Sequence, residues 1–272
     1  MAPQSTFSFQ LFSDLHLEAP KAYDVFELPA QSPCAALIGD IGCVKDKGLL
    51  EFLQLQLERF KLVFFLLGNH EPYHSNWHHA TTTIEKFASD MKQLRNTNTA
   101  LGEFVFLNRT RYDTDDEVTI LGCTLYSMIG PTKDDMDRVS MGLNDFYKID
   151  DWTVEQHNEA HIADLAWLNA EVQKIATQEP HRKVVILTHH SPTKDPRGVD
   201  PRHANSPISS GFCTDLSEEV CWTSPCVKVW AFGHTHFNCD FGGRPGWQVV
   251  TNQRGYYFAQ ADVYMGDKVI EI

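Results

Sequence analysis

Five short blocks rich in Asp, Asn and His hold the residues of this sequence that are best suited to chemistry. The blocks are Ser13-Asp14-Leu15-His16, Gly39-Asp40, Gly68-Asn69-His70-Glu71, Thr188-His189-His190 and Gly233-His234-Thr235-His236. Each follows an apolar run that is typical of a buried strand. Carboxylate, amide oxygen and imidazole are ligands for divalent metal ions. The repeated placement of such side chains at strand ends therefore indicates a site for two metal ions.

The order of these blocks resembles the pattern of the calcineurin-like metallophosphoesterase superfamily. That pattern is D-x-H, G-D-x-x-D, G-N-H-[DE], a single His after a strand, and G-H-x-H, and the resemblance extends from residue 14 to residue 236. It implies an α/β fold, a four-layer α/β/β/α sandwich of two mixed sheets with the site at the strand ends. It also implies a single metallophosphoesterase domain over residues 1–272.

The resemblance implies seven metal ligands and two divalent transition-metal ions. By position in the family pattern, one ion would bind Asp14, His16 and His236, the other would bind Asn69, His189 and His234, and Asp40 would bridge both. A shared carboxylate offsets the repulsion between two close cations. We expect His189 rather than His190 as ligand because it directly follows the strand. The mixed nitrogen and oxygen donors leave Mn, Fe and Zn open.

The resemblance also implies a mechanism, in which a metal-bridging hydroxide attacks phosphorus and His70 is the general acid. An imidazole suits proton donation because its ordinary pKa is near 6.5. One position departs from the family: Cys43 stands where the second Asp of G-D-x-x-D orients the catalytic His. Glu71 is not expected to replace that Asp, because neighbouring side chains diverge. The sequence therefore leaves open which residue orients His70.

Substrate contacts are predicted from a weaker likeness. The stretch Asn252-Gln253-Arg254-Gly255-Tyr256 resembles an N-P-R-G-Y stretch that follows G-H-x-H in some branches of the family. Arg254 is the predicted substrate-binding residue, because a guanidinium can hold phosphate oxygens bidentately. Tyr73 and the histidines after it are expected on a helix surface rather than in the site.

Composition limits the partners and the compartment. The net charge is −13, and the absence of a Lys/Arg-rich run argues against general nucleic-acid binding. No apolar run approaches the length of a membrane span. The start of the sequence lacks a basic segment followed by an apolar one, and the pI is about 5.4, so we expect a cytoplasmic protein. The seven cysteines lack C-x-x-C spacing and are expected to be free thiols.

The predicted elements alternate between strand and helix in the first half of the chain, which indicates parallel strands. Strands are predicted at Phe7–Ser13, Cys34–Gly39, Lys61–Gly68, Phe104–Leu107, Val118–Tyr126, Lys183–Thr188, Val227–Phe232 and Trp247–Thr251. Helical spacing marks residues 49–60, 75–94 and 162–175, the last after a capping box at Thr153–Gln156. Gly130–Lys148 and Ser191–Ser210 are predicted to be long loops.

The leading functional prediction is metal-dependent hydrolysis of a phosphomonoester or phosphodiester of a small molecule or cyclic nucleotide. Two alternatives stay open. A protein Ser/Thr phosphatase is less expected, because the pattern G-D-x-x-D-R-G is missing. The second alternative is a non-catalytic scaffold, since a retromer subunit keeps the family fold and uses it for protein contacts. That subunit lacks the His of the third block, whereas His70 is present here.

Overall fold

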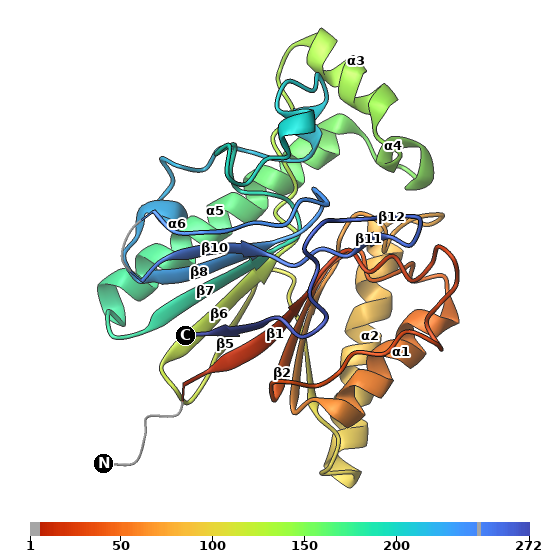
Figure 1. Cartoon of the computed structure of the whole chain (residues 1–272), viewed down its shortest axis with the longest axis vertical. Coiled ribbons are helices and arrows are strands. Elements are labelled where there is room, and N and C mark those ends of the chain that lie inside the picture. The colour runs from red at the N-terminus through yellow and green to blue at the C-terminus, as the bar shows by residue number, and fades with distance from the viewer. Residues whose placement is uncertain (1–5, 244–245) are drawn as a thin grey trace.

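The computed structural model describes residues 6–243 and 246–272, which form two β-sheets lying face to face with helices on both outer sides (Figure 1). The first sheet has the order β13-β1-β2-β3-β4 and the second has the order β5-β6-β7-β8-β10-β9. The strands of the first sheet are β1 (Ser8–Phe12), β2 (Cys34–Ile38), β3 (Leu62–Leu66), β4 (Glu103–Phe106) and β13 (Val269–Glu271). Those of the second are β5 (Thr110–Asp113), β6 (Val118–Cys123), β7 (Lys183–Thr188), β8 (Val227–Phe232), β9 (Asp240–Phe241) and β10 (Gln248–Thr251).

Both sheets are mixed, with a parallel centre. β1 to β4 are parallel to their neighbours and β13 is antiparallel to β1, while β6, β7, β8 and β10 are parallel and β5 and β9 are antiparallel edge strands. A separate hairpin pairs β11 (Gly255–Tyr256) with β12 (Ala259–Gln260). The carboxyl ends of parallel strands meet at one edge of a sheet, so side chains that follow these strands are brought together.

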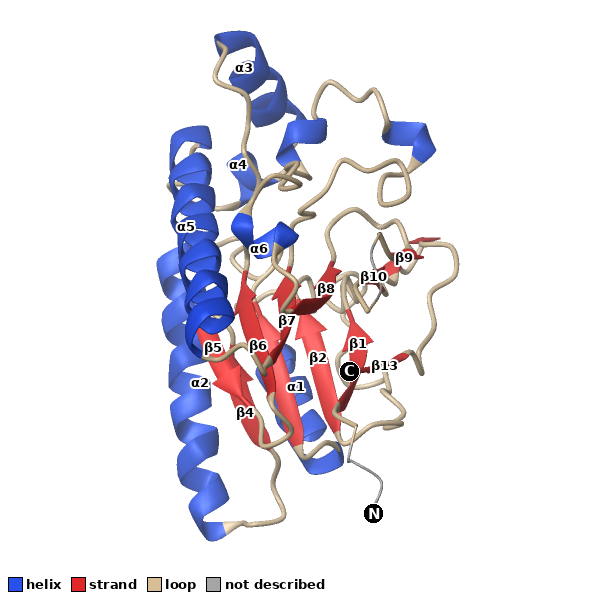
Figure 2. Ribbon diagram, turned by 90° about the vertical axis from the view of Figure 1, so that its left-hand side faces the viewer, coloured by secondary structure: helices blue, strands red, loops and turns tan. Residues whose placement is uncertain are grey.

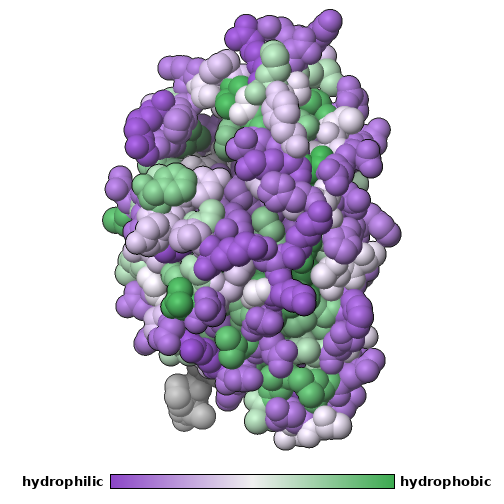
Figure 3. Space-filling view, turned by 90° about the vertical axis from the view of Figure 1, so that its right-hand side faces the viewer, coloured by the Kyte–Doolittle hydropathy of each residue, from purple (hydrophilic) through white to green (hydrophobic). Residues whose placement is uncertain are grey.

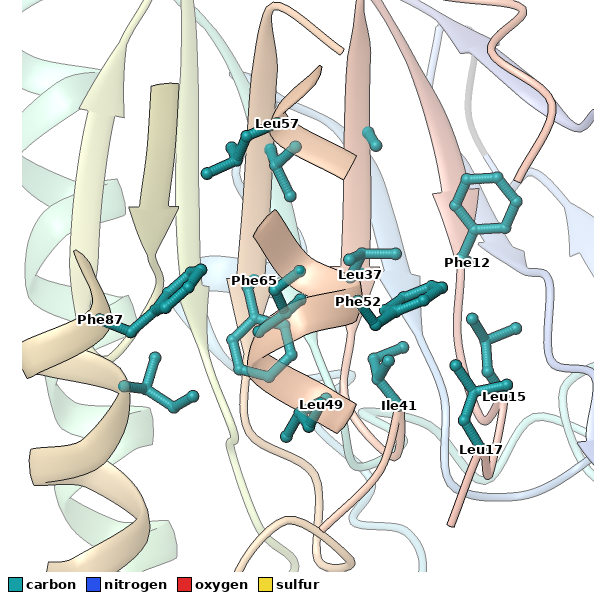
Figure 4. Packing of buried hydrophobic residues seen from close by; sticks show 14 of the residues in the cluster. Phe12, Leu15, Leu17, Leu37, Ile41, Leu49, Phe52, Leu57, Phe65 and Phe87 are labelled. Atoms are coloured by element: carbon teal, nitrogen blue, oxygen red, sulfur yellow. The ribbon is translucent and has the colours of Figure 1, made fainter. Parts of the chain in front are cut away.

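Alternating side chains on the first sheet separate two hydrophobic layers. On β1, Phe9 and Leu11 face the second sheet, whereas Phe12 packs on the other side against α1 (Lys47–Arg59). Figure 4 shows this outer layer, in which Phe52 of α1 lies over the sheet. The long helix α2 (Trp77–Thr97) covers the same face.

A third hydrophobic layer covers the opposite face of the second sheet. There α5 (Val154–Gln178) and the short α6 (Val220–Thr223) pack through residues such as Leu168 and Val172 around the fully buried Trp230. Helices, sheet, sheet and helices therefore form four layers, and the predicted α/β/β/α sandwich is confirmed. The prediction of a single domain over residues 1–272 stays a prediction.

Most predicted strands are found within two residues of their expected bounds, but three expectations were wrong. Gly130–Lys148 is not only loop, since it holds α3 (Lys133–Gly142) and α4 (Asp145–Lys148). The side chain of Thr132 caps the start of α3. Only Val139 of this helix is buried, so the helix needs no apolar stripe, and the sequence shows none. The helical spacing over residues 162–175 predicts an apolar face that begins at Ile162, but this side chain is 56% exposed on α5 (Val154–Gln178).

The strand predicted at Val118–Tyr126 ends earlier, at Cys123, because Leu125 and Tyr126 have left-handed φ values of 70° and 54°. Helix α5 holds this turn with buried polar side chains. Asp164 accepts a hydrogen bond of 2.8 Å from the Leu125 backbone nitrogen, and His161 donates one of 3.0 Å to the Leu125 carbonyl. The turn is therefore fixed by side chains from the neighbouring layer.

The loops above the strand ends carry the remaining short elements. The second predicted long loop, Ser191–Ser210, holds the 3₁₀ turn η1 (Pro201–His203) and ends within the 3₁₀ turn η2 (Ser209–Gly211). Within the described ranges, no helix combines the length and hydrophobicity of a membrane span. The face shown in Figure 3 is largely hydrophilic, with apolar residues in small groups. Residues 1–5, on which the expectation about the start of the chain rests, lie outside the described residues.

Candidate metal centre

The seven predicted ligands follow strands of both sheets. Those of the first sheet come after β1, β2 and β3, and those of the second come after β7 and β8. Figure 2 shows the parallel strands running toward the loops that carry α3 and α4. The ligand side chains are buried, apart from His236, whose side chain is 27% exposed.

An unusual backbone brings these side chains to one point. Left-handed φ values between 48° and 70° occur at five predicted ligands: Asp14, His16, Asp40, His234 and His236. Such values are uncommon outside glycine and tend to persist where the surrounding structure holds a functional arrangement. The turns let residues two apart in the sequence, such as Asp14 and His16, point at the same site.

The motif glycines make room for this convergence. A Cβ on Gly68 would lie 2.5 Å from the Asp40 backbone nitrogen and 2.7 Å from His189 Cε1. Gly39 has a φ of 89°, and a Cβ there would lie 2.7 Å from the Gly68 nitrogen and collide with His189 Nδ1. The loops after β2 and β3 can therefore approach the His189 ring only if both positions lack a side chain.

The first cluster consists of Asp14, His16 and His236, whose donor atoms lie within 4.8 Å of one another. His16 Nε2 is 2.9 Å from His236 Nε2, and His236 Nε2 is 3.3 Å from Asp14 Oδ1. Asp40 adjoins this group, with Oδ2 3.9 Å from His16 Nε2. These residues are the ligands predicted for one ion.

The second cluster consists of Asp40, His189 and His234, with Asn69 beside them. His189 Nε2 lies 3.4 Å from Asp40 Oδ1 and 3.1 Å from Asn69 Oδ1. Asp40 thus presents one oxygen to each cluster, as a bridging ligand would. Neither ring nitrogen of the adjacent His190 has a hydrogen-bond partner among the described residues.

The hydrogen bonds behind the second cluster show that its atoms fit a cation. His189 donates from Nδ1 to the Ile38 carbonyl at 3.0 Å, so its Nε2 faces two oxygens. Burial lowers the pKa of His189, but the charge of Asp40 outweighs burial and raises it to about 10, which favours a proton on Nε2 when no metal ion is bound. Asn69 donates a hydrogen bond from its amide nitrogen to Asp145 Oδ1 at 2.8 Å, so its amide oxygen faces His189. Two oxygens and an imidazole nitrogen that converge in this way need a positive charge between them, which a proton on His189 or a bound metal ion supplies. The donor set of carboxylate, amide and imidazole therefore fits a divalent metal ion.

His70 lies beside both clusters. Its Nε2 is 3.9 Å from Asp40 Oδ2 and 3.1 Å from the Tyr256 hydroxyl, and its Nδ1 is 2.8 Å from Glu18 Oε1. Burial lowers the pKa of His70, but the charge of Asp40 and the hydrogen bond to Glu18 outweigh burial and raise it to about 9. The ring is therefore protonated at neutral pH and is placed to donate a proton toward the site. Donor atoms of His16, Asp40 and His70 also lie within 4.8 Å of one another.

Glu71 supports the backbone rather than His70. Its carboxylate accepts hydrogen bonds from the backbone nitrogens of Gly68, Asp40 and Ile41 at 2.7, 3.0 and 2.8 Å, and from that of Gly42 at 3.3 Å. These bonds join the loops after β2 and β3. The acid of the third block thus fixes the turn that carries Asp40.

A cavity of about 360 Å³ opens from the predicted metal ligands toward the loops above them. Its floor includes Asp40, His70 and Tyr256. Apolar side chains from the long loops and from the end of α3 form much of the wall: Leu143, Val199, Ile208 and Phe212. No Lys or Arg occurs among the described residues that line this cavity.

Arg254, the predicted substrate-binding residue, lies behind the site. Its guanidinium donates to the Leu15 carbonyl at 2.9 Å and stacks over the Phe26 ring at 4.7 Å. It is not among the described residues that line the cavity. A contact between Arg254 and phosphate stays a prediction.

Three residues near the ligands were not assigned to the site from the sequence. Tyr73 is buried, lines the cavity and donates to Asp145 Oδ1 at 2.7 Å, whereas a surface position was expected. Asp145 belongs to the segment expected as loop. Glu18 follows His16 by two residues, and an acid at this spacing just after the first block is the signal that could have indicated it.

Comparisons with known proteins identify the family of this chain. The family model for calcineurin-like phosphoesterases matches residues 7–238. The uncharacterised protein L509 of Acanthamoeba polyphaga mimivirus is 29% identical over 262 residues, which cover 90% of this chain and 89% of the relative.

Two solved structures share the fold. Phosphopantetheinyl hydrolase (PptH) from Mycobacterium tuberculosis has a TM-score of 0.71 at 13% identity, covering 99% of this chain and 96% of that one. A dimetal phosphatase from Danio rerio has a TM-score of 0.54 at 14% identity, covering 92% and 88%. At these identities both comparisons establish the fold alone.

The fold and the donor set together define a metallophosphatase-like hydrolase, an enzyme class that uses divalent metal ions. Within this class, the chain belongs to the calcineurin-like phosphoesterase family, because the family model covers most of its length. It is a metal-dependent phosphoesterase.

Proposed function

We propose that this protein hydrolyses a small-molecule phosphomonoester or phosphodiester with two divalent ions held by the seven predicted ligands. The observation that carries the proposal is the position of the two clusters at the floor of the cavity, with the buried His70 beside them. When bound, such ions supply positive charge to the phosphoryl oxygens and lower the pKa of a bound water.

The residues of the chain have separable tasks in this proposal. Asp40 presents one oxygen to each cluster and would hold both ions. His70 donates a proton from Nε2 to the leaving oxygen, a task supported by its raised pKa. The Tyr256 hydroxyl lies 3.1 Å from His70 Nε2, on the side of the ring that would face the leaving group.

The cavity supports a small substrate over a folded phosphoprotein. Its volume of about 360 Å³ is in the range of sites for small ligands. The walls formed by Leu143, Ile208 and Phe212 are suited to an uncharged or apolar group on the phosphate. We therefore expect the part of the substrate beyond the phosphate to carry little charge.

The test compares p-nitrophenyl phosphate with bis(p-nitrophenyl) phosphate, using protein stripped of metal and then supplied with Mn²⁺, Fe²⁺ or Zn²⁺. We expect hydrolysis that needs metal, and a loss of about 10²-fold or more in kcat in a His70→Asn variant on an ester with a poor leaving group. His79→Asn, an exposed position on α2, is the matched control and should keep full activity. No metal-dependent turnover of either ester, in protein that has bound no metal, would contradict the proposal.

A further inference from the structure

Glu18 lies between two imidazoles of the site. Its Oε1 is 2.8 Å from His70 Nδ1 and 3.1 Å from His16 Nδ1. The side chain is 12% exposed, and the other oxygen, Oε2, is buried with no hydrogen-bond partner within the described part of the chain. The two rings are therefore the hydrogen-bond donors that offset the burial of this carboxylate.

We propose that Glu18 is the positioning residue that replaces the carboxylate missing at Cys43 and aligns His70 for proton donation. The same oxygen also orients His16, so one side chain would set both the proton donor and a predicted metal ligand. The inference rests on the function proposed above and adds a residue that acts through His70 rather than on the substrate.

The geometry determines which nitrogen of each ring is available. A carboxylate only accepts, so the proton of each ring lies on Nδ1 at its contact with Glu18. For His16 this leaves Nε2 as a lone pair, 2.9 Å from His236 Nε2 in the first cluster. For His70 it turns Nε2 toward Asp40 and Tyr256.

Stacking and hydrogen bonding restrain different motions of the two rings. His70 stacks on Tyr73 with a centroid distance of 4.2 Å, and His16 stacks on Tyr256 at 4.1 Å. Stacking fixes the plane of a ring but permits a 180° flip about its Cβ–Cγ bond, which exchanges each ring nitrogen with a ring carbon. The hydrogen bonds to Glu18 oppose that flip, which is the contribution that no apolar neighbour can make.

The other candidates for this task are occupied elsewhere. Cys43 is buried in a small cluster with Tyr73 and Ile149, and burial raises the pKa of its thiol, which stays uncharged. Both oxygens of Glu71 accept from backbone nitrogens. Glu18 is thus the carboxylate that the structure places on the outer nitrogen of His70.

The first test uses the full chain loaded with Mn²⁺ and compares an ester with a good leaving group, p-nitrophenyl phosphate, with phenyl phosphate, which has a poorer one. A proton donor matters most for the poorer leaving group. We expect Glu18→Ala to lower kcat by about 10–100-fold for phenyl phosphate and by less than about 3-fold for p-nitrophenyl phosphate. Metal content is measured alongside and kept at the wild-type level by excess Mn²⁺. An equal loss for both esters at full metal content would overturn the proposal.

Two further variants separate positioning from a structural effect. In a His70→Asn background, Glu18→Ala should lower kcat by less than about a further 3-fold, because the effects of residues that act as one unit are not additive. If the double variant instead lost kcat by the product of the two single losses, the proposal would be contradicted. Glu18→Gln keeps an acceptor oxygen and should recover most of the activity on phenyl phosphate. Glu27→Ala removes an exposed acid from the same segment and should change neither ester.

The last measurement does not depend on activity. Long-range ¹H–¹⁵N spectra of metal-free protein report which ring nitrogen of His16 and His70 carries the proton. We expect Nδ1–H in the wild type, for His16 at neutral pH and for His70 above its pKa of about 9, where that ring is neutral, and a shift toward Nε2–H in Glu18→Ala; unchanged tautomers would overturn the proposal. If the wild type hydrolysed neither ester, the function proposed above would fail while these spectra still tested Glu18.

Discussion

Asp145 joins the loop above the cavity to Asn69, a predicted metal ligand. Replacing Asp145 should therefore destabilise the protein and weaken metal binding through Asn69. Its Oδ1 accepts from Asn69 Nδ2 at 2.8 Å and from the Tyr73 hydroxyl at 2.7 Å, and the residue is 3% exposed. Asp145→Ala removes the acceptor from two buried donors. Each unsatisfied donor costs about 1–3 kcal/mol, so we expect a loss of about 2–6 kcal/mol in the free energy of unfolding. The middle of that range corresponds to a fall in Tm of roughly 10 °C for a chain of this size.

The same change should affect metal binding at one of the two positions. Without Asp145, the amide of Asn69 is free to rotate its oxygen away from His189. Loss of such a partner behind a ligand typically weakens metal affinity by about 10–100-fold. Calorimetric titration of metal-free protein with Mn²⁺ should show one weakened site and one unchanged site.

Asp145→Asn is the matched comparison. Both hydrogen bonds end on Oδ1, so an amide oxygen at that place can keep them, and burial raises the pKa of Asp145, which favours an uncharged group there. We expect less than about 1 kcal/mol of destabilisation. Asp137→Ala, on the exposed side of α3, controls for the loss of charge. If Asp145→Ala melted within 2 °C of the wild type, by the scale of ~2–4 °C per kcal/mol, and bound both ions normally, the reasoning would be refuted.

Three further predictions concern the core of the site and the layer behind it. Gly68→Ala should cost about 1–3 kcal/mol and reduce Mn²⁺ binding, because the new Cβ would press on the backbone of Asp40; urea unfolding and metal content measure both, and a variant with normal binding would contradict the close packing. For Asp164, burial raises the pKa from 3.8 to about 6, so its contribution to stability is present below pH 4 and is lost as the pH rises to 6. As the pH rises from 4 to 7, the free energy of unfolding of Asp164→Asn, measured in urea, should therefore increase by roughly 3 kcal/mol relative to that of the wild type. A difference between the two proteins that does not change with pH would show that the pKa of this carboxyl is not raised. Mn²⁺ at about 100 times its Kd should raise the free energy of unfolding by about 2.7 kcal/mol per site, which melting with and without a chelator tests.

The predicted ligand positions could be read from the sequence because each lies directly after a strand of strong apolar character. The four layers followed from the family resemblance, since alternation along β1 does not by itself reveal a second sheet. The partners behind the ligands could not be predicted in the same way. Asn69 and Asp145 are 76 positions apart, and their contact depends on how α4 folds back over the strand ends.

The misplaced elements have the same kind of cause. Helix α3 buries only Val139, so its sequence lacks the stripe by which helices are recognised. The left-handed turn at Leu125 depends on Asp164, which lies 39 positions away. Glu18 lies outside the D-x-H pattern, which gives no role to its position, and the family pattern places the orienting acid at the position of Cys43.

The division of the ligands between the two sheets has a consequence for the order of events during synthesis. Asp14, His16, Asp40 and Asn69 lie within the first 69 residues, whereas His189, His234 and His236 come after residue 188. A growing chain that has left the ribosome only as far as α5 would hold four of the seven predicted ligands and neither complete set. Stable uptake of both ions would therefore follow translation of β8, and a filled centre would mark a chain whose two sheets have already met.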